Sequence, residues 1–146
     1  MARFIFPLQN ILTVKEKLEE QAKNEFSQAN ARLREAEDEE QRLRDREQAA
    51  EETLRQTLNE SLDVMEIKKC EDAVEILKVY VKEQHLIVIK CAREVEIARE
   101  KLNEAIKERK TFEKLREHAF EDFVKEQNLQ EQKEVDELVS YRHGRT

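Results

Sequence analysis

Three histidines and two cysteines are the residues of this sequence best suited to metal binding or nucleophilic chemistry. His85, His118 and His143 are far apart, and none belongs to the His-x-x-x-His spacing that places two ligands on one helix face. Cys70 and Cys91 would lie about 30 Å apart on a continuous helix, which is too far for a disulfide. Their spacing also fits no zinc site, so the sequence predicts reduced thiols, no metal and no cofactor.

Catalysis of other kinds needs features that the sequence does not supply. A single glycine cannot build a phosphate-binding loop or a nucleophile elbow. Carboxylates are abundant, but on a long helix they form solvated faces instead of the partly dry pocket that shifts a pKa. We therefore expect a protein that is not an enzyme.

The composition is that of a helical assembly without a thick core. Charged residues make up 42% of the chain and hydrophobic residues 38%, whereas globular domains average about 25% charged residues. Low hydrophobicity with high charge also fits disorder. However, the chain has one Pro and one Gly and is dominated by strong helix formers. That composition with a heptad period is typical of a coiled coil.

Charge and hydropathy argue against two kinds of partner. The formal net charge is −7, and no basic stripe suggests nucleic-acid binding. No run of about 18 apolar residues is present to span a membrane. Residues 1–12 are interrupted by polar groups, so they lack the continuous apolar region of a signal peptide. The sequence thus predicts a cytoplasmic protein that does not insert directly into a membrane.

Apolar residues in the first half recur at the spacing of a coiled-coil seam. Pro7 suits the first turn of a helix, where its missing N–H costs nothing, and this helix is predicted over about 7–58. The expected seam is Leu8, Ile11, Leu18, Ala22, Phe26, Ala29, Leu33, Ala36, Leu43, Ala50, Leu54 and Leu58, with Glu40 and Glu47 filling two rungs. The two steps of four residues from Leu18 to Phe26 indicate a local stutter in the heptad.

The second half carries a cleaner heptad pattern. Between residues 77 and 123, eleven of the fourteen positions that alternate four and three residues apart are apolar or Cys. They are Leu77, Val81, Val88, Cys91, Val95, Ala98, Leu102, Ala105, Phe112, Ala119 and Phe123. The exceptions are Gln84, Arg109 and Arg116. A stripe this regular and this narrow predicts a helix that needs a partner helix.

The two seams are joined by a reversal, unless the chain runs on as one rod of about 200 Å. Asn59, Ser61 and Asp63 form the only interior cluster of cap and turn residues, and Asp63 with Glu66 can form a capping box. We therefore predict a single all-α domain over 1–146, a long antiparallel two-helix coiled-coil hairpin. Its predicted parts are the first helix (about 7–58), the reversal (about 59–69) and the second helix (about 70–140).

Three segments depart from a simple two-helix pattern. The apolar run 4–8 is expected to pack on the second helix near Phe120 and Phe123. Segment 74–89 is apolar on more than one face, so either a short extra helix from the reversal or a partner protein is expected to cover it. Segment 131–139 lies past the predicted paired region. Its apolar edge suits either a solvated tail or docking into a partner groove.

Three motifs recur in an order that is typical of a known family. They are Phe4-x-Phe6-Pro7-Leu8-Gln9-x-x-Leu12-x-x-Lys15-Glu16, Arg109-Lys110-x-x-Glu113-Lys114-Leu115 and Glu131-Gln132-Lys133-Glu134-x-Asp136-Glu137. Together with its length and two-helix pattern, these motifs make the chain resemble the flagellar export protein FliJ of bacterial type III secretion. Many relatives carry a Gly at the reversal, and this chain does not.

The resemblance implies a non-catalytic stalk. Members of this family are cytoplasmic parts of the flagellar export apparatus and are similar to the central stalk of rotary ATP synthases. They are held to insert into the hexameric ring of the export ATPase, to link it to the membrane export-gate protein, and to bind export chaperones. By resemblance, this chain is expected to sit at the cytoplasmic face of the inner membrane through its partners.

The same resemblance implies two partner-binding sites. The site for the ATPase ring would comprise Phe4, Phe6, Leu8, Gln132, Lys133, Asp136 and Glu137. The site for the export gate would comprise Val74, Val81 and His85, where the run Glu83-Gln84-His85 is similar to the family's pattern. Lys78 departs from that pattern, since an apolar residue is expected on the same face.

Other functions remain open at this point. A generic coiled-coil scaffold would form a stable dimer with its C-terminal helix paired, whereas a stalk would be a monomeric hairpin with that helix bare. A stalk of a related virulence secretion system would have the same shape. A membrane-surface amphipathic helix fits poorly, because the net charge is negative and the polar faces are mixed.

Overall fold

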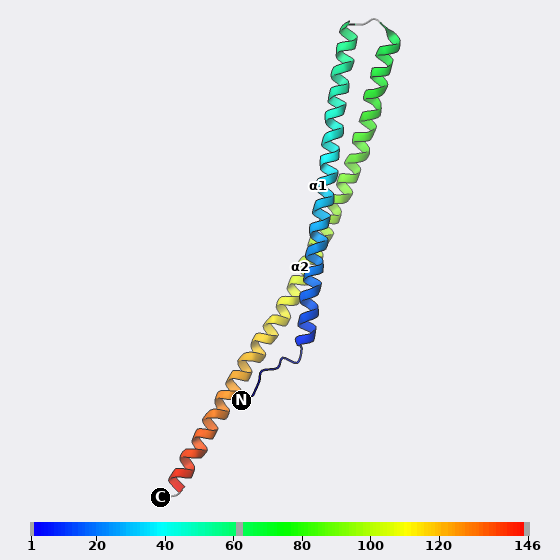
Figure 1. The fold of residues 1–146 in the computed structure, drawn as a ribbon. Coiled ribbons are helices and arrows are strands. Elements are labelled where there is room, and N and C mark those ends of the chain that lie inside the picture. Colours follow the sequence, from blue (N-terminus) through cyan, green and yellow to red (C-terminus); the bar gives the residue numbers. More distant parts are fainter. Residues whose placement is uncertain (1, 61–62, 145–146) are drawn as a thin grey trace. The chain divides into compact units, whose positions relative to one another are not determined.

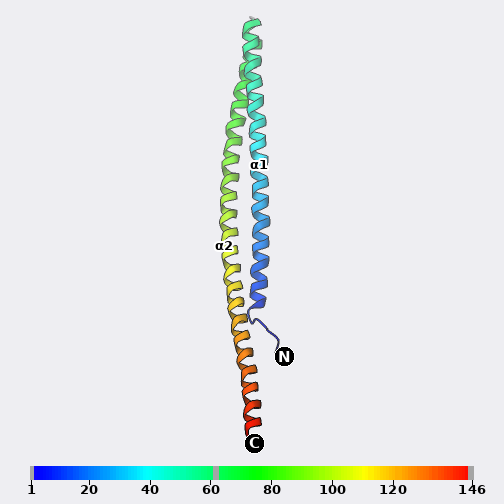
Figure 2. The same ribbon diagram turned by 90° about the vertical axis from the view of Figure 1, so that its left-hand side faces the viewer.

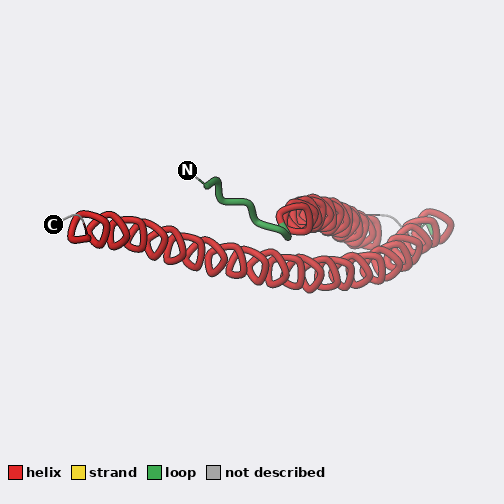
Figure 3. Tube along the Cα trace, turned by 90° about the horizontal axis from the view of Figure 1, so that it is seen from below, coloured by secondary structure: helices red, strands yellow, loops and turns green. Residues whose placement is uncertain are grey.

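The chain folds into two long helices, as seen in a computed structural model that describes residues 2–60 and 63–144 (Figure 1). Helix α1 is Gln9–Glu60, with 52 residues, and helix α2 is Val64–Gly144, with 81 residues. Residues 2–8 form the loop and turn that precede α1 (Figure 3). The described residues contain no strand. The two helices pack against each other, which confirms the predicted all-α two-helix hairpin.

Contacts divide the chain into two units, each of which contains part of both helices. The terminal unit comprises Met1–Gln21 and Leu102–Thr146, and the turn unit comprises Ala22–Lys101. Within each unit the two helices run antiparallel, since residues early in α1 contact residues late in α2. The two helices can be followed along the chain in Figure 2.

The core of the turn unit is built from small and branched side chains on facing helices. Ala29, Val95 and Ala98 are buried, and Phe26 and Leu33 pack against them. The alanines let the helix backbones approach closely, so the larger Val95 and Leu33 fill the space between them. These positions belong to the predicted seams, and their burial confirms that part of the heptad assignment.

The start of α2 is fixed by the side chain of Asp63. Its carboxylate Oδ1 accepts a hydrogen bond from the Met65 N–H at 3.0 Å, and its carbonyl oxygen accepts one from Ile67 at 3.1 Å. This is the geometry of a helix N-cap. Because the cap acts at this position, α2 begins at Val64, well before the expected start near residue 70. Asn59 lies inside α1, and Ser61 falls outside the described residues.

The seam of α1 in the terminal unit differs from the predicted one. Leu8, Ile11 and Leu18 were expected to face α2, but their exposed fractions are 36%, 41% and 44%. Leu12 and Glu19 are buried in their place, with exposed fractions of 2% and 7%. Ile11 and Leu18 therefore lie on a neighbouring face of α1, and Leu8 lies in the turn that precedes the helix.

The predicted stutter is also wrong. The buried and half-buried residues of α1 continue back from Phe26 at the regular spacing of three and four residues, through Ala22, Glu19 and Lys15 to Leu12. The heptad is thus unbroken, and two of its rungs are charged. The prediction considered apolar residues alone. It therefore assigned Leu18 to the seam and omitted the charged heptad positions.

Candidate functional site

Each polar exception in the α2 seam has a specific partner. The Gln84 side-chain amide donates to the carbonyl oxygen of Ala36 at 3.0 Å. The Arg109 guanidinium donates to both carboxylate oxygens of Glu19, at 2.6 and 3.3 Å. The Arg116 guanidinium lies 5.8 Å from the centre of the Phe4 ring. Partners of this kind satisfy the polar groups at the seam and help to fix the helix register.

The Glu19–Arg109 layer is part of a larger ion-pair network in the terminal unit. Arg109 also donates to Glu113 at 2.7 Å, one turn further along α2. Lys15 donates to Glu108 at 2.8 Å, and its ammonium lies 5.9 Å from the Phe112 ring centre. The carboxylates of Glu19 and Glu113 raise the pKa of Arg109. The network therefore keeps its charged form and holds α1 to α2 at this level.

A second ion-pair cluster lies on the turn unit. Glu40 Oε1 is 2.9 Å from Arg44 Nη2 and 2.8 Å from His85 Nδ1. The hydrogen bond from Arg44, aided by His85, lowers the pKa of the Glu40 carboxyl. Shifts in this direction stabilise the charged carboxylate and do not prepare it to exchange protons near neutral pH.

The N-terminal segment packs against α2 through aromatic rings, as predicted. The centre of the Phe4 ring lies 5.2 Å from that of Phe120 in an edge-to-face arrangement, and 5.5 Å from that of Phe123. Phe6 is buried, with an exposed fraction of 7%. Of the N-terminal residues assigned to the ATPase-ring site, Phe4 and Phe6 thus anchor the segment, and Leu8 is exposed.

The four C-terminal residues assigned to the same site lie on the exposed end of α2. Gln132, Lys133, Asp136 and Glu137 are all exposed, and the Gln132 amide donates to Asp136 at 3.2 Å. Gln132 follows Phe123 by about 14 Å along the helix axis. The structure therefore does not bring the N-terminal and C-terminal members of this site into one cluster.

The end of α2 also exposes large apolar side chains. Val135, Leu138 and Val139 form the predicted apolar edge, with exposed fractions of 52%, 65% and 49%. Leu129 and Tyr141 extend it and were not singled out from the sequence; their exposed fractions are 71% and 59%. All residues from 128 to 144 are exposed. This helix end has the chemistry of a helix that binds in a groove.

The residues assigned to the export-gate site lie in two different environments. Val74 and Val81 are buried between the helices, with exposed fractions of 6% and 8%, so they belong to the core of the turn unit. His85 is exposed and pairs with Glu40. Segment 74–89 is thus apolar on two faces. One face forms the seam with α1, and the other faces outward.

The outward-facing part of this region is uncovered. The exposed large apolar residues are Ile76, Val79, Tyr80, Leu86, Ile87 and Ile89. An extra helix from the reversal was one expected cover, but in the described residues the chain passes from α1 to α2 with no further helix. These side chains therefore remain open to a partner.

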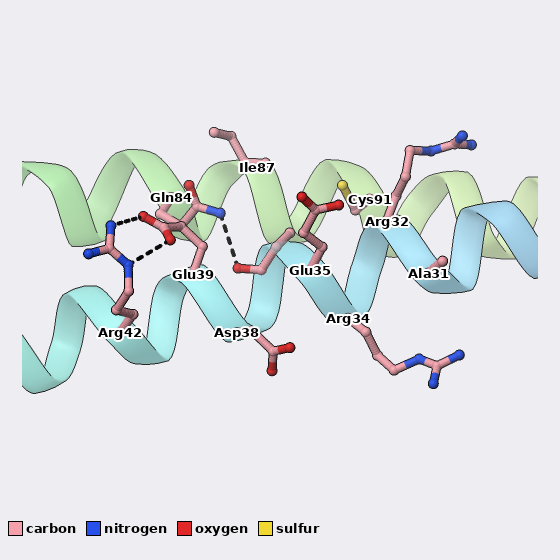
Figure 4. A pocket seen from close by; sticks show the side chains of 11 residues that line it. Ala31, Arg32, Arg34, Glu35, Asp38, Glu39, Arg42, Gln84, Ile87 and Cys91 are labelled. Atoms are coloured by element: carbon pink, nitrogen blue, oxygen red, sulfur yellow. Dashed lines mark hydrogen bonds and ion pairs between the residues drawn. The ribbon is translucent and has the colours of Figure 1, made fainter.

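A long open groove follows one side of the turn unit, with a volume of about 970 Å³ (Figure 4). Its α2 wall contains Gln84, Ile87 and Cys91, and its α1 wall is rich in charged side chains. Arg42 bridges to Glu39 at 2.6 Å on this wall. Ala31 and Ala36 are the small residues of its lining.

Two further features bear on the class of protein. Within residues 2–60 and 63–144, no group of three or more His, Cys, Asp and Glu side chains is arranged to hold a metal ion. In the same part of the chain, neither helix has a stretch apolar enough to cross a membrane.

The fold and its exposed surfaces define a helical hairpin that presents open helix faces and a bare helix end. The chain belongs to the flagellar FliJ protein family, whose profile matches residues 4–146. Among solved structures it is similar to a putative YscO homolog, CT670, from Chlamydia trachomatis. The two share 24% identity at a TM-score of 0.48, over 98% of this chain and 96% of the other. No curated protein sequence matches the chain.

Proposed function

We propose that this protein is a non-catalytic stalk and adaptor of the bacterial flagellar type III export apparatus. The observation that carries the proposal is the family match, which extends over residues 4–146 and so over both helices. In this role the chain binds the hexameric export ATPase, the membrane export-gate protein and export chaperones. It is then held at the cytoplasmic face of the inner membrane by its partners.

The end of α2 is the surface that we assign to the ATPase ring. Its exposed apolar residues, with Leu138 the most exposed of the predicted edge, alternate with charged groups such as Lys133 and Glu137. A helix of this kind can insert into the central opening of a ring and present its apolar edge to the ring. Leu8 and Ile5 are also exposed, but on the N-terminal segment, which packs near Phe120 and Phe123 and not at this helix end.

The turn unit is the surface that we assign to the export gate. His85 is exposed there. Val74 and Val81 lie in the core, so they support the site from beneath and do not contact the partner. A contact through this region would use His85 and side chains that lie beside it on the surface.

The ATPase interaction can be tested directly with the cognate flagellar export ATPase. ATP turnover and hexamer formation should both rise when the full chain is added. A chain that ends after Phe123 should lose this effect, because it lacks the exposed end of α2. The full-length variant Ser140→Glu is the matched control, since it adds a charge at an exposed position beside the apolar edge.

Two alternatives predict different results. A generic dimerising scaffold would leave ATPase turnover unchanged and would form a dimer that pairs the end of α2. A stalk of a virulence secretion system would stimulate the ATPase of that system and not the flagellar one. Either result would overturn the proposed flagellar role.

A further inference from the structure

The N-terminal segment, residues 2–8, lies on α2 through the ring of Phe4. This ring contacts both Phe120 and Phe123, and the Arg116 guanidinium lies 5.8 Å from its centre. In the described part of the chain, no hydrogen bond or ion pair joins the segment to α2. The attachment of the segment to α2 therefore depends mainly on the Phe4 ring.

The other end of the segment is fixed at the start of α1. Phe6 is buried, and its carbonyl oxygen accepts a hydrogen bond from the Gln9 N–H at 3.1 Å. If Phe4 leaves α2, this bond and the burial of Phe6 still join the segment to α1. The segment thus has one fixed end and one end that a single side chain holds in place.

The contact between the segment and α2 is only partly closed to water. A hollow of about 520 Å³ is lined by segment residues 3–6, by Gln9 and by Arg116. Phe120 keeps an exposed fraction of 50% although Phe4 packs on it. A contact with a hydrated hollow beside it opens locally at a smaller cost than a close-packed core does. The segment can therefore open while the two helices stay paired.

The surface that the segment covers continues onto the exposed end of α2. Leu138 follows Phe120 by 18 residues, and Tyr141 follows Phe123 by the same interval. All four residues belong to one continuous helix. Eighteen residues make about five complete turns of an α-helix, so the two members of each pair point in the same direction. Phe120 and Phe123 thus form the inner end of an apolar face whose outer end contains Leu138 and Tyr141.

We propose that the N-terminal segment is an autoinhibitory strap, which covers the inner end of this face until a partner displaces Phe4. The partner is the export ATPase ring, so the inference rests on the proposed function and adds a control to the same site. The outer end of the face binds the ring whether the strap is closed or open. The inner end joins the contact only when the strap opens. Phe4 then competes with the ring, whereas the family resemblance assigned it to direct contact with the ring.

The expected strength of the strap follows from its ring contacts. An aromatic pair corresponds to about two- to twelvefold in an equilibrium constant, and Phe4 forms two such pairs. The cost of ordering the segment offsets part of this gain, which gives a closed-to-open ratio on the order of ten. A partner that needs the open form then binds about tenfold more weakly to the wild type than to a chain whose strap stays open.

Opening of the strap can be measured on the full chain without a partner. Trypsin cleavage after Arg3 requires the segment to leave α2, so its rate follows the open population. Phe4→Ala should be cleaved about tenfold faster than the wild type. Ile5→Ala is the matched control, because Ile5 is 75% exposed in the same segment, and its rate should stay within about twofold of the wild-type rate. Equal rates for Phe4→Ala and the wild type would overturn the strap.

The effect on the partner is measured as the concentration of chain that gives half-maximal stimulation of the cognate flagellar export ATPase. Phe4→Ala should lower this concentration about tenfold, and Ile5→Ala should leave it within about twofold of the wild-type value. By linkage, adding the ATPase hexamer should speed trypsin cleavage of the wild type after Arg3. A direct contact between Phe4 and the ring predicts the opposite sign in both measurements, with weaker stimulation by Phe4→Ala and protection of Arg3.

The two proposals fail in different ways. If the wild type stimulates the ATPase and Phe4→Ala requires an equal or higher concentration, the strap is overturned and the stalk function holds. If neither the wild type nor Phe4→Ala stimulates the ATPase, the proposed function fails, and the control that rests on it fails as well. Stimulation by Phe4→Ala at a lower concentration than the wild type supports both.

Discussion

Two adjacent residues near the start of α1, Ile11 and Leu12, distinguish the observed seam from the one predicted by apolar spacing. Leu12 is 2% exposed and Ile11 is 41% exposed. Replacing Leu12 by Ala should therefore destabilise the terminal unit, and replacing Ile11 by Ala should not. The seam predicted from the sequence requires the opposite order, because it contains Ile11 and omits Leu12.

The expected loss of stability follows from the number of carbons that each variant deletes and from how deeply those carbons are buried. Leu→Ala deletes three carbons, worth about 0.8 kcal/mol each when fully buried. This gives about 2.4 kcal/mol for Leu12, near the lower end of the range of about 2–5 kcal/mol for Leu→Ala in cores. Ile11 buries much less of its side chain, and Ala is the better helix former. For Ile11→Ala we expect a change smaller than about 0.5 kcal/mol.

The two variants can be compared by urea unfolding, followed by circular dichroism at a helical band. Leu12→Ala should lower the midpoint clearly, and the midpoint of Ile11→Ala should lie close to that of the wild type. Equal losses in the two variants, or a larger loss for Ile11→Ala, would refute the seam described here. Both residues belong to one turn of α1, so differences between regions of the chain do not enter the comparison.

Three further predictions concern polar and aromatic contacts. Arg109→Leu should destabilise the chain because it leaves the buried Glu19 carboxylate without its main partner, and adding Glu19→Leu should recover stability in a double-mutant cycle by urea unfolding. Phe120→Ala should release residues 2–8, so limited proteolysis should cut there faster while the helix signal stays unchanged. The lowered pKa of Glu40 means that its stabilising effect is complete above its ordinary value near 4.5 and is lost as the pH falls through the lower folded value. Glu40→Gln should therefore reduce the loss of stability measured between about pH 6 and pH 3, and an unchanged loss would contradict this role.

The sequence was sufficient to predict the fold because the seam of α2 is almost entirely apolar. The heptad positions from Leu77 to Phe123 are buried or half-buried, apart from the exposed Arg116. A narrow apolar stripe on a long helix has few ways to leave water other than pairing with a second helix. The aromatic residues 120 and 123 likewise marked the surface on which the N-terminal segment packs.

The polar rungs were harder to predict, because burial of a charge depends on its partner. Glu19 enters the seam only because Arg109 reaches it from the facing helix, and the two residues are far apart in the sequence. The sequence did contain an indication of this pair. Arg109 occupies a heptad position among apolar residues, and a buried arginine there requires an acidic partner on the facing helix. That rule would have placed Glu19 in the seam and extended the heptad to Leu12 without a stutter.

The candidate binding surfaces are the hardest part to derive from the sequence, since a surface depends on which faces the seam leaves exposed. Val74 and Val81 fit an apolar motif but serve the core, whereas the nearby Leu86 and Ile87 face outward. The heptad spacing placed Val81 in the seam, whereas the family resemblance assigned the same residue to a partner surface. The end of α2 was easier, because it extends beyond the last seam residue.

The stalk function is tested most directly by ATP hydrolysis of the flagellar export ATPase in the presence of three full-length chains. The wild type and Ser140→Glu should stimulate turnover to the same extent. Leu138→Glu should stimulate much less, because it places a charge on the apolar edge of the exposed helix end. Equal turnover with and without the wild-type chain, or full stimulation by Leu138→Glu, would contradict the assignment of this helix end to the ATPase ring.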